Sequence, residues 1–104
     1  MKRVIDGKIY DTKTAEEICE LPCSAQGKSD FRYHDTDLYR TKRGAYFLAG
    51  EGGAMSMWAQ SVGNAYTWGD GLRVISKEEA REYAEAAELS PEDMQAAGFE
   101  IEEG

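Results

Sequence analysis

The sequence predicts an α+β fold: a small antiparallel sheet of about five or six short strands with one N-terminal helix and a C-terminal helical pair. Three observations predict it. An Asp-Gly pair between apolar residues indicates an early hairpin, short alternations of aromatic and polar residues indicate a central meander, and two helix-start signals follow residue 75. The chain has 104 residues, so we expect a single domain spanning 1–104.

The first predicted elements are a hairpin and a helix. Asp6-Gly7 suits the positive φ angles of a two-residue turn between Val4-Ile5 and Lys8-Ile9-Tyr10. Thr14-Ala15-Glu16-Glu17 has the pattern of a capping box, in which the Thr hydroxyl and the Glu carboxylate each satisfy a free amide. Pro22 disfavours helical geometry at the residue before it, so the predicted helix ends there.

The middle of the chain is predicted to form short strands joined by tight turns. Three strands are expected at 31–34, 38–41 and 45–49, with turns at 35–37 and 42–44. The glycines of 50–53 are expected to break the chain, and 54–59 suits another strand or a short helix. A long loop with aromatic anchors is expected at 61–71, before a strand at 72–75.

Two helices are predicted at the C-terminal end. Ser76-Lys77-Glu78-Glu79 is a second capping box and opens a helix over roughly 77–88. Ser90-Pro91 opens a third helix with proline at its first position, and Gly98 is its expected stop. The residues expected in the core are Val4, Ile9, Ile18, Phe31, Leu38, Phe47, Leu48, Val74, Ile75 and Tyr83.

The charge is distributed unevenly along the chain. There are 12 Lys and Arg against 20 Asp and Glu, a net charge of −8. Residues 1–75 hold ten of each sign, so the whole imbalance lies in the acidic helical part, 76–104. This asymmetry indicates either a partner-facing surface or a solvated face that keeps the protein soluble.

Few residues carry a signal for catalysis or metal binding. Cys19 and Cys23 lack the two-residue spacing and the further ligands of a zinc knuckle, so two free thiols are favoured over zinc or a disulfide. The glycine-rich 50–53 stretch lacks the Gly-Lys-Ser/Thr ending of a phosphate loop, and Glu51 would repel phosphate. We therefore predict no catalytic residues, no metal and no cofactor.

The predicted partner-binding residues are mostly carboxylates. A surface of carboxylates resembles the phosphates of a duplex, and a groove lined with Lys and Arg would attract it. Lys42-Arg43 at a hairpin tip is expected to contribute shape, whereas the charge of −8 argues against direct nucleic-acid binding. The full set is Glu78, Glu79, Glu82, Glu85, Glu88, Glu92, Asp93, Lys42, Arg43 and Glu51.

The string LYRTKRGAYFLAGEGG over 38–53 resembles the core of a family of small proteins found on phages, plasmids and integrative elements. In that family a hairpin and helix precede this core and an acidic helix follows it, and the resemblance extends over about residues 3–88. Some relatives are associated with anti-CRISPR activity. The resemblance implies an accessory protein of a mobile element that acts by binding, and it brings no catalytic residues.

These observations favour a non-enzymatic, anti-CRISPR-like inhibitor of a host nucleic-acid-targeting defence complex, with a CRISPR-associated complex as its partner. The alternatives are a regulatory or homodimeric interaction module, and an enzyme acting on nucleotide or RNA through Cys23 or His34 with Glu51. No apolar run has the roughly 20 residues of a membrane helix, so we expect a cytoplasmic protein without a membrane partner. Both monomer and homodimer remain open.

Overall fold

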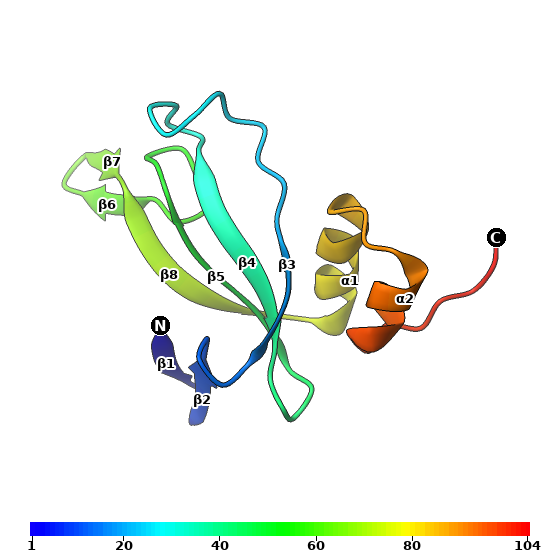
Figure 1. Cartoon of the computed structure of the whole chain (residues 1–104). Coiled ribbons are helices and arrows are strands. Elements are labelled where there is room, and N and C mark those ends of the chain that lie inside the picture. The colour runs from blue at the N-terminus through cyan, green and yellow to red at the C-terminus, as the bar shows by residue number, and fades with distance from the viewer.

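A four-stranded antiparallel sheet with the order β3-β4-β5-β8 forms the centre of the computed structural model, which describes residues 1–104 (Figure 1). Two hairpins, β1-β2 and β6-β7, flank it. The strands are β1 (Lys2–Ile5), β2 (Lys8–Asp11), β3 (Glu16–Glu20), β4 (His34–Arg40), β5 (Tyr46–Gly52), β6 (Gln60–Val62), β7 (Ala65–Thr67) and β8 (Gly69–Ile75). Helices α1 (Lys77–Ala86) and α2 (Pro91–Ala96) follow, and neither is long and apolar enough to cross a membrane.

The predicted α+β fold with an N-terminal helix is wrong, because the chain is mostly sheet and its two short helices both follow the last strand. The segment expected to be helical forms β3, which pairs with β4 from Glu16↔Arg40 to Glu20↔Asp37. Only seven residues separate Thr14 from Pro22. A helix that short is marginal without tertiary support, and pairing with β4 supplies a ladder of hydrogen bonds instead.

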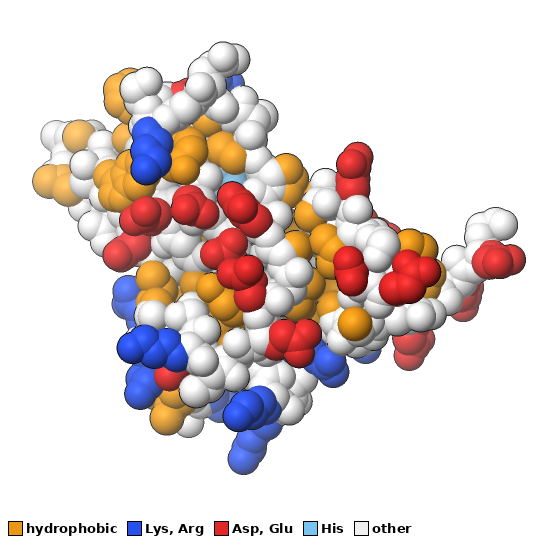
Figure 2. Space-filling view, in the orientation of Figure 1, with side chains coloured by type: hydrophobic (Ala, Val, Ile, Leu, Met, Phe, Trp, Pro, Cys, Tyr) orange, Lys and Arg blue, Asp and Glu red, His pale blue; other side chains and the backbone are white.

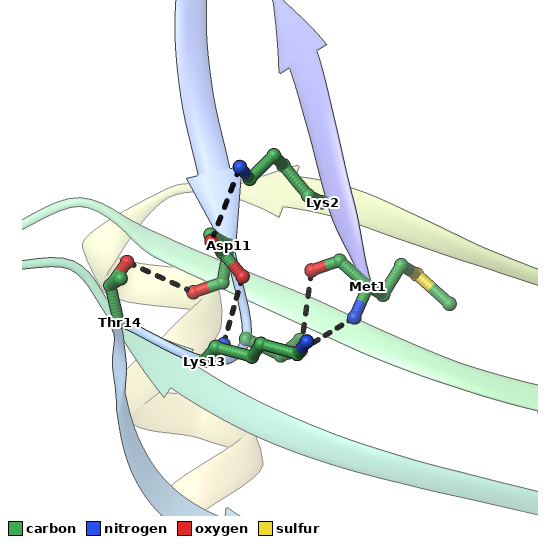
Figure 3. A network of polar contacts seen from close by, with 6 residues as sticks. Met1, Lys2, Asp11, Lys13 and Thr14 are labelled. Carbon is green, nitrogen blue, oxygen red and sulfur yellow. Dashed lines mark hydrogen bonds and ion pairs between the residues drawn. The ribbon is translucent and has the colours of Figure 1, made fainter.

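Local hydrogen bonds also draw this segment away from a helix (Figure 3). The carboxylate of Asp11 accepts from the backbone N–H of Lys13 at 2.9 Å, and its carbonyl accepts from the N–H of Ala15 at 3.0 Å. The Thr14 hydroxyl bonds back to the same carbonyl rather than capping a helix. Asp side chains favour such turns, and this one leads the chain from β2 into β3.

The central strands are longer than predicted. β4 runs continuously through 35–37, where a turn was expected, and the predicted strand at 31–34 is a turn up to His34. β5 begins at Tyr46, one residue after the start of the predicted strand at 45–49, and continues to Gly52, so the expected break at 50–53 is wrong over most of its length. The predicted loop at 61–71 contains the β6-β7 hairpin and the start of β8.

Glycines let the segment 54–59 cross the sheet closely. Gly50↔Gly71 and Gly52↔Gly69 are cross-strand pairs; the buried Trp58 lies against Gly69 and Gly71, and Ser56 lies against Gly52. A Cβ at Gly50 would collide with the Asp35 carbonyl oxygen, and one at Gly71 would lie 3.1 Å from the Trp58 ring. The glycines predicted to break the chain are instead required by this close packing, and 54–59 forms turns rather than a strand or helix.

The main core lies between one face of the sheet and the helices. Leu38, Tyr46, Leu48 and Ile75 of the sheet pack there with apolar residues of α1, α2 and the segment that follows α2. The Tyr46 hydroxyl donates to the Ala97 carbonyl oxygen at 2.6 Å, which fastens the end of α2 to β5. A smaller cluster of Tyr10, Phe47 and Ala49 lies on the opposite face, beneath the β1-β2 hairpin.

Six of the ten predicted core residues are buried or pack against the core, and four are exposed. Leu38, Phe47, Leu48 and Ile75 are buried, and Ile18 and Tyr83 pack at the edge of the main cluster. The four exposed residues are Val4 (69% exposed), Ile9 (65%), Phe31 (66%) and Val74 (37%). Val4 and Ile9 form a cross-strand pair on the outer side of a two-stranded hairpin, so their apolar character does not place them in the core.

The C-terminal helices agree with their predicted start signals. Ser76 caps α1 in a capping box with Glu79, and Ser90 caps α2 with Pro91 at its first position. α1 ends at Ala86, two residues earlier than expected, and Glu88 follows with a φ of 59°. Gly98 has a φ of 95° just after α2, which is the left-handed geometry expected at a helix end.

Candidate partner-binding surface

The sheet face opposite the helices carries six carboxylates, which we call the acidic sheet face: Glu17, Glu20, Asp35, Asp37, Glu51 and Asp70. Strand alternation places them together, because cross-strand partners in an antiparallel pair point to the same side. Asp35, Glu51 and Asp70 form one row across β4, β5 and β8. Glu20 and Asp37 form a second row, and Glu17 lies opposite Tyr39 in a third.

No Lys or Arg neutralises this face. The ion pairs in the structure are Lys2–Asp11 and Arg32–Asp30, and neither involves one of the six carboxylates. Burial and the charges of Glu17, Asp35 and Glu20 raise the pKa of Asp37 to about 6. Like charges directly opposite each other destabilise a sheet, so the acidic sheet face opposes folding rather than favouring it.

The first row of carboxylates borders a shallow hollow of about 260 Å³. Asp35, Glu51 and Asp70 line it together with Asp37, and Met1 and Thr12 of the β1-β2 region close one side. The three carboxylates of this row are exposed to solvent. The arrangement therefore presents negative charge on a wide, open surface rather than in an enclosed pocket.

Charges that balance in the sequence of residues 1–75 are separated in space. Figure 2 shows acidic side chains gathered over β8, β5, β4 and β3, and most of the visible basic ones at the lower end of the molecule. Lys42 and Arg43 form the exposed turn between β4 and β5, and they line a cleft of about 610 Å³ with Lys8. This turn is at the opposite end of β5 from Glu51, so the two predicted partner-binding groups do not form one surface.

The predicted glutamates of the C-terminal part fall into separate groups. Glu78, Glu82 and Glu85 form an exposed stripe on α1, opposite the buried Ala80 and Ala84. The remaining members lie elsewhere: Glu79 accepts from the Ser76 N–H, Glu88 follows the helix end, and Glu92 and Asp93 occupy the first turn of α2. None of them forms an ion pair within the chain.

His34 and Glu51, weighed together for catalysis, do not converge. His34 is paired with Gly52, and Glu51 with Asp35, so the His34 and Glu51 side chains lie on opposite faces of the sheet. His34 Nδ1 instead lies 2.9 Å from the hydroxyl oxygen of Thr36, which also accepts from Trp58 Nε1 at 2.8 Å.

Both cysteines are free thiols. Burial, together with the charges of Asp37 and Glu17, raises the pKa of Cys19 to about 11, which keeps this thiol protonated at neutral pH. No group of three or more His, Cys, Asp or Glu side chains has the arrangement of a metal site.

Of the acidic sheet face, the sequence prediction contained only Glu51. The signal for the others is the alternation Asp35-Thr36-Asp37-Leu38-Tyr39, whose even positions are buried or apolar and whose odd positions are polar or aromatic. The prediction of a turn at 35–37 divides this stretch between two short strands. The same pattern fits one half-buried strand, which would have put Asp35 and Asp37 on one face.

Comparison with known proteins adds no relative: no family model, no curated protein and no solved structure matches the chain.

Proposed function

We propose that this protein is a non-enzymatic inhibitor that binds the basic, nucleic-acid-binding surface of a host defence complex through its acidic sheet face. The observation that carries the proposal is the set of six carboxylates on one sheet face with no Lys or Arg partner in the chain. Such an array costs folding free energy, and a cationic partner would recover that energy on binding.

The spacing of the array supports mimicry of nucleic acid. Neighbouring strands lie about 4.8 Å apart, and successive rows on one face are about 6.8 Å apart along the strands. Three rows therefore span roughly 14 Å, a length over which a duplex carries about eight phosphate charges. Six carboxylates in that length approach the charge density of DNA.

The resemblance of residues 38–53 to mobile-element proteins, some of them associated with anti-CRISPR activity, supports a CRISPR effector as the partner. The choice of a CRISPR effector goes beyond what the charge of the acidic sheet face supports by itself. The carboxylates alone support any protein whose nucleic-acid channel is lined with Lys and Arg, and a defence effector is one member of that class that a mobile element meets.

Two triple variants with the same change in charge test the proposal. Asp35→Asn, Glu51→Gln and Asp70→Asn neutralise the first row, and Glu78→Gln, Glu82→Gln and Glu85→Gln neutralise the α1 stripe; either set changes the net charge from −8 to −5. The assay measures how each protein displaces a fluorescent target duplex from purified RNA-guided effectors of several types.

We expect the wild type and the α1 variant to displace the duplex, and the sheet variant to be weaker by about tenfold or more, or ~1.4 kcal/mol. Equal losses in the two variants would mean that net charge rather than the sheet face is responsible. Failure of the wild type against every effector type would refute the choice of a CRISPR partner.

A further inference from the structure

β8 is an edge strand whose outer side pairs with no other strand. The Thr41 N–H donates to the Ala45 carbonyl and the Gly53 N–H to the Tyr33 carbonyl. Because hydrogen-bonded and non-hydrogen-bonded pairs alternate in an antiparallel ladder, the odd-numbered residues of β4 and β5 form the hydrogen-bonded pairs. The odd-numbered residues of β5 therefore exchange hydrogen bonds with β4, and the even-numbered residues of β5 turn their N–H and C=O groups toward β8. Their partners in β8 are the odd-numbered residues, whose backbone groups point toward β5. The N–H and C=O groups of Asp70, Leu72 and Val74 therefore point outward, and no other backbone hydrogen bond involves them.

The two edges of the sheet differ in how they are protected. β3 has a register shift between Glu17 and Cys19, and its sequence contains Glu16, Glu17 and Glu20. Bulges and charged side chains of this kind discourage a further strand from pairing. β8 is seven residues long and pairs with β5 without a register shift, and Asp70 and Val74 are exposed.

We propose that the β8 edge binds an extended segment of a partner protein by strand addition, and that the side chains this segment places over the acidic sheet face are one lysine or arginine and, at the next alternate positions, apolar residues. A strand paired with β8 would place alternate side chains on the acidic sheet face, opposite Asp70, Leu72 and Val74. Asp70 belongs to the first row with Glu51 and Asp35, so the lysine or arginine of the bound segment lies opposite Asp70. Leu72, which is partly buried against the cluster of Tyr10, Phe47 and Ala49, and the 37% exposed Val74 match apolar side chains.

Charge favours a basic segment over a second copy of this chain. Each copy carries −8, and pairing β8 with β8 would bring two acidic sheet faces side by side. The basic character of the segment rests on the proposed function, whereas strand pairing rests on the unpaired backbone alone.

Backbone-methylated peptides separate strand addition from simple charge attraction. The probe is a synthetic peptide, Thr-Val-Thr-Val-Thr-Lys, whose antiparallel alignment places Val, Val and Lys opposite Val74, Leu72 and Asp70. One form is N-methylated at Val, Val and Lys, whose N–H groups would face β8, and the other is N-methylated at the three threonines. The two forms have the same side chains and the same charge.

NMR titration and amide hydrogen exchange measure the binding. We expect the threonine-methylated and unmodified peptides to slow exchange at Asp70, Leu72 and Val74, and the other form to bind about tenfold more weakly or worse, because it lacks three hydrogen bonds. Val74→Pro removes one outward N–H and should weaken binding, whereas the matched Val74→Thr should not. Circular dichroism verifies that both variants fold.

Equal binding of the two methylated forms, or shifts spread over the acidic sheet face without protection of β8, would overturn the proposal. A dimer in light scattering that Val74→Pro converts to a monomer would also overturn it, in favour of a second copy at this edge. Binding that depends on backbone methylation but is equally strong when threonine replaces the peptide's lysine would retain strand addition and refute the basic segment. None of these peptide-binding measurements uses duplex displacement, so a failure of strand addition is distinguishable from a failure of the proposed inhibition.

Discussion

Replacing Asp37 by Asn should stabilise the protein above neutral pH. Asp37 lies on the acidic sheet face among Glu17, Glu20 and Asp35, and its partial burial together with these charges raises its pKa from 3.8 to about 6. The raised pKa means that the charged carboxylate is disfavoured in the folded state. Asparagine has nearly the same shape without the charge, so the substitution isolates this repulsion.

The sign and size of the effect follow from linkage. Between pH 3.8 and about 6 the folded protein binds a proton at Asp37 more readily than the unfolded chain does, so this group stabilises the fold as the pH falls. Above this window the carboxylate is charged in both the folded and the unfolded state, so its repulsion and desolvation lower the free energy of unfolding by their full amount. Because Asp37 is only partly buried, solvent screens much of the repulsion, and we expect about 1 kcal/mol.

Urea denaturation of the wild type and Asp37→Asn across this pH range measures the effect. The variant should be more stable by about 1 kcal/mol at about pH 8, and the difference should disappear as the pH falls below the unfolded value of 3.8. Asp6→Asn, in the exposed β1-β2 turn, is the matched control and should show no such step. A variant that is less stable than the wild type at high pH would refute the idea that this face is a site of unrelieved repulsion.

Three other predictions concern the packing beneath this face. Thr36→Val should cost about 1–3 kcal/mol in urea denaturation, because the buried Trp58 N–H loses its acceptor; Thr36→Ser should recover most of it. Gly50→Ala should cost more than about 2 kcal/mol or prevent folding, because its Cβ would meet the Asp35 carbonyl, and a neutral result would show that the sheet relaxes there. Tyr46→Phe should cost about 1 kcal/mol and expose the α2 end to faster hydrogen exchange, since the hydroxyl no longer reaches the Ala97 carbonyl; unchanged exchange would contradict this anchoring.

Local signals predicted the elements that depend on neighbours in sequence. Asp6-Gly7 occupies the β1-β2 turn with both φ angles positive, and Ser76 and Ser90 cap the two helices. The interpretation failed where distant pairing decides the structure. Thr14 has the sequence context of a helix cap, but β4 pairs with the residues after it, and nothing in the local pattern reveals that partner.

The candidate site was missed for a related reason. The net charge of 1–75 is zero, which hides the separation of acids onto one sheet face and of Lys42 and Arg43 to the far end of β4. Sequence position reports the charge of a segment, but strand alternation and register decide the charge of a surface. The α1 stripe was visible in the sequence because helical spacing is local, and the acidic sheet face required the fold.

The dependence of effector binding on salt, compared between the wild type and the variant with Asp35→Asn, Glu51→Gln and Asp70→Asn, tests the central claim most directly. If these carboxylates take the place of phosphates, the wild-type affinity should fall steeply with rising salt and the variant should show a clearly shallower slope. Parallel slopes for the two proteins, or a wild-type affinity that does not change with salt, would contradict the assignment of the acidic sheet face as the binding surface.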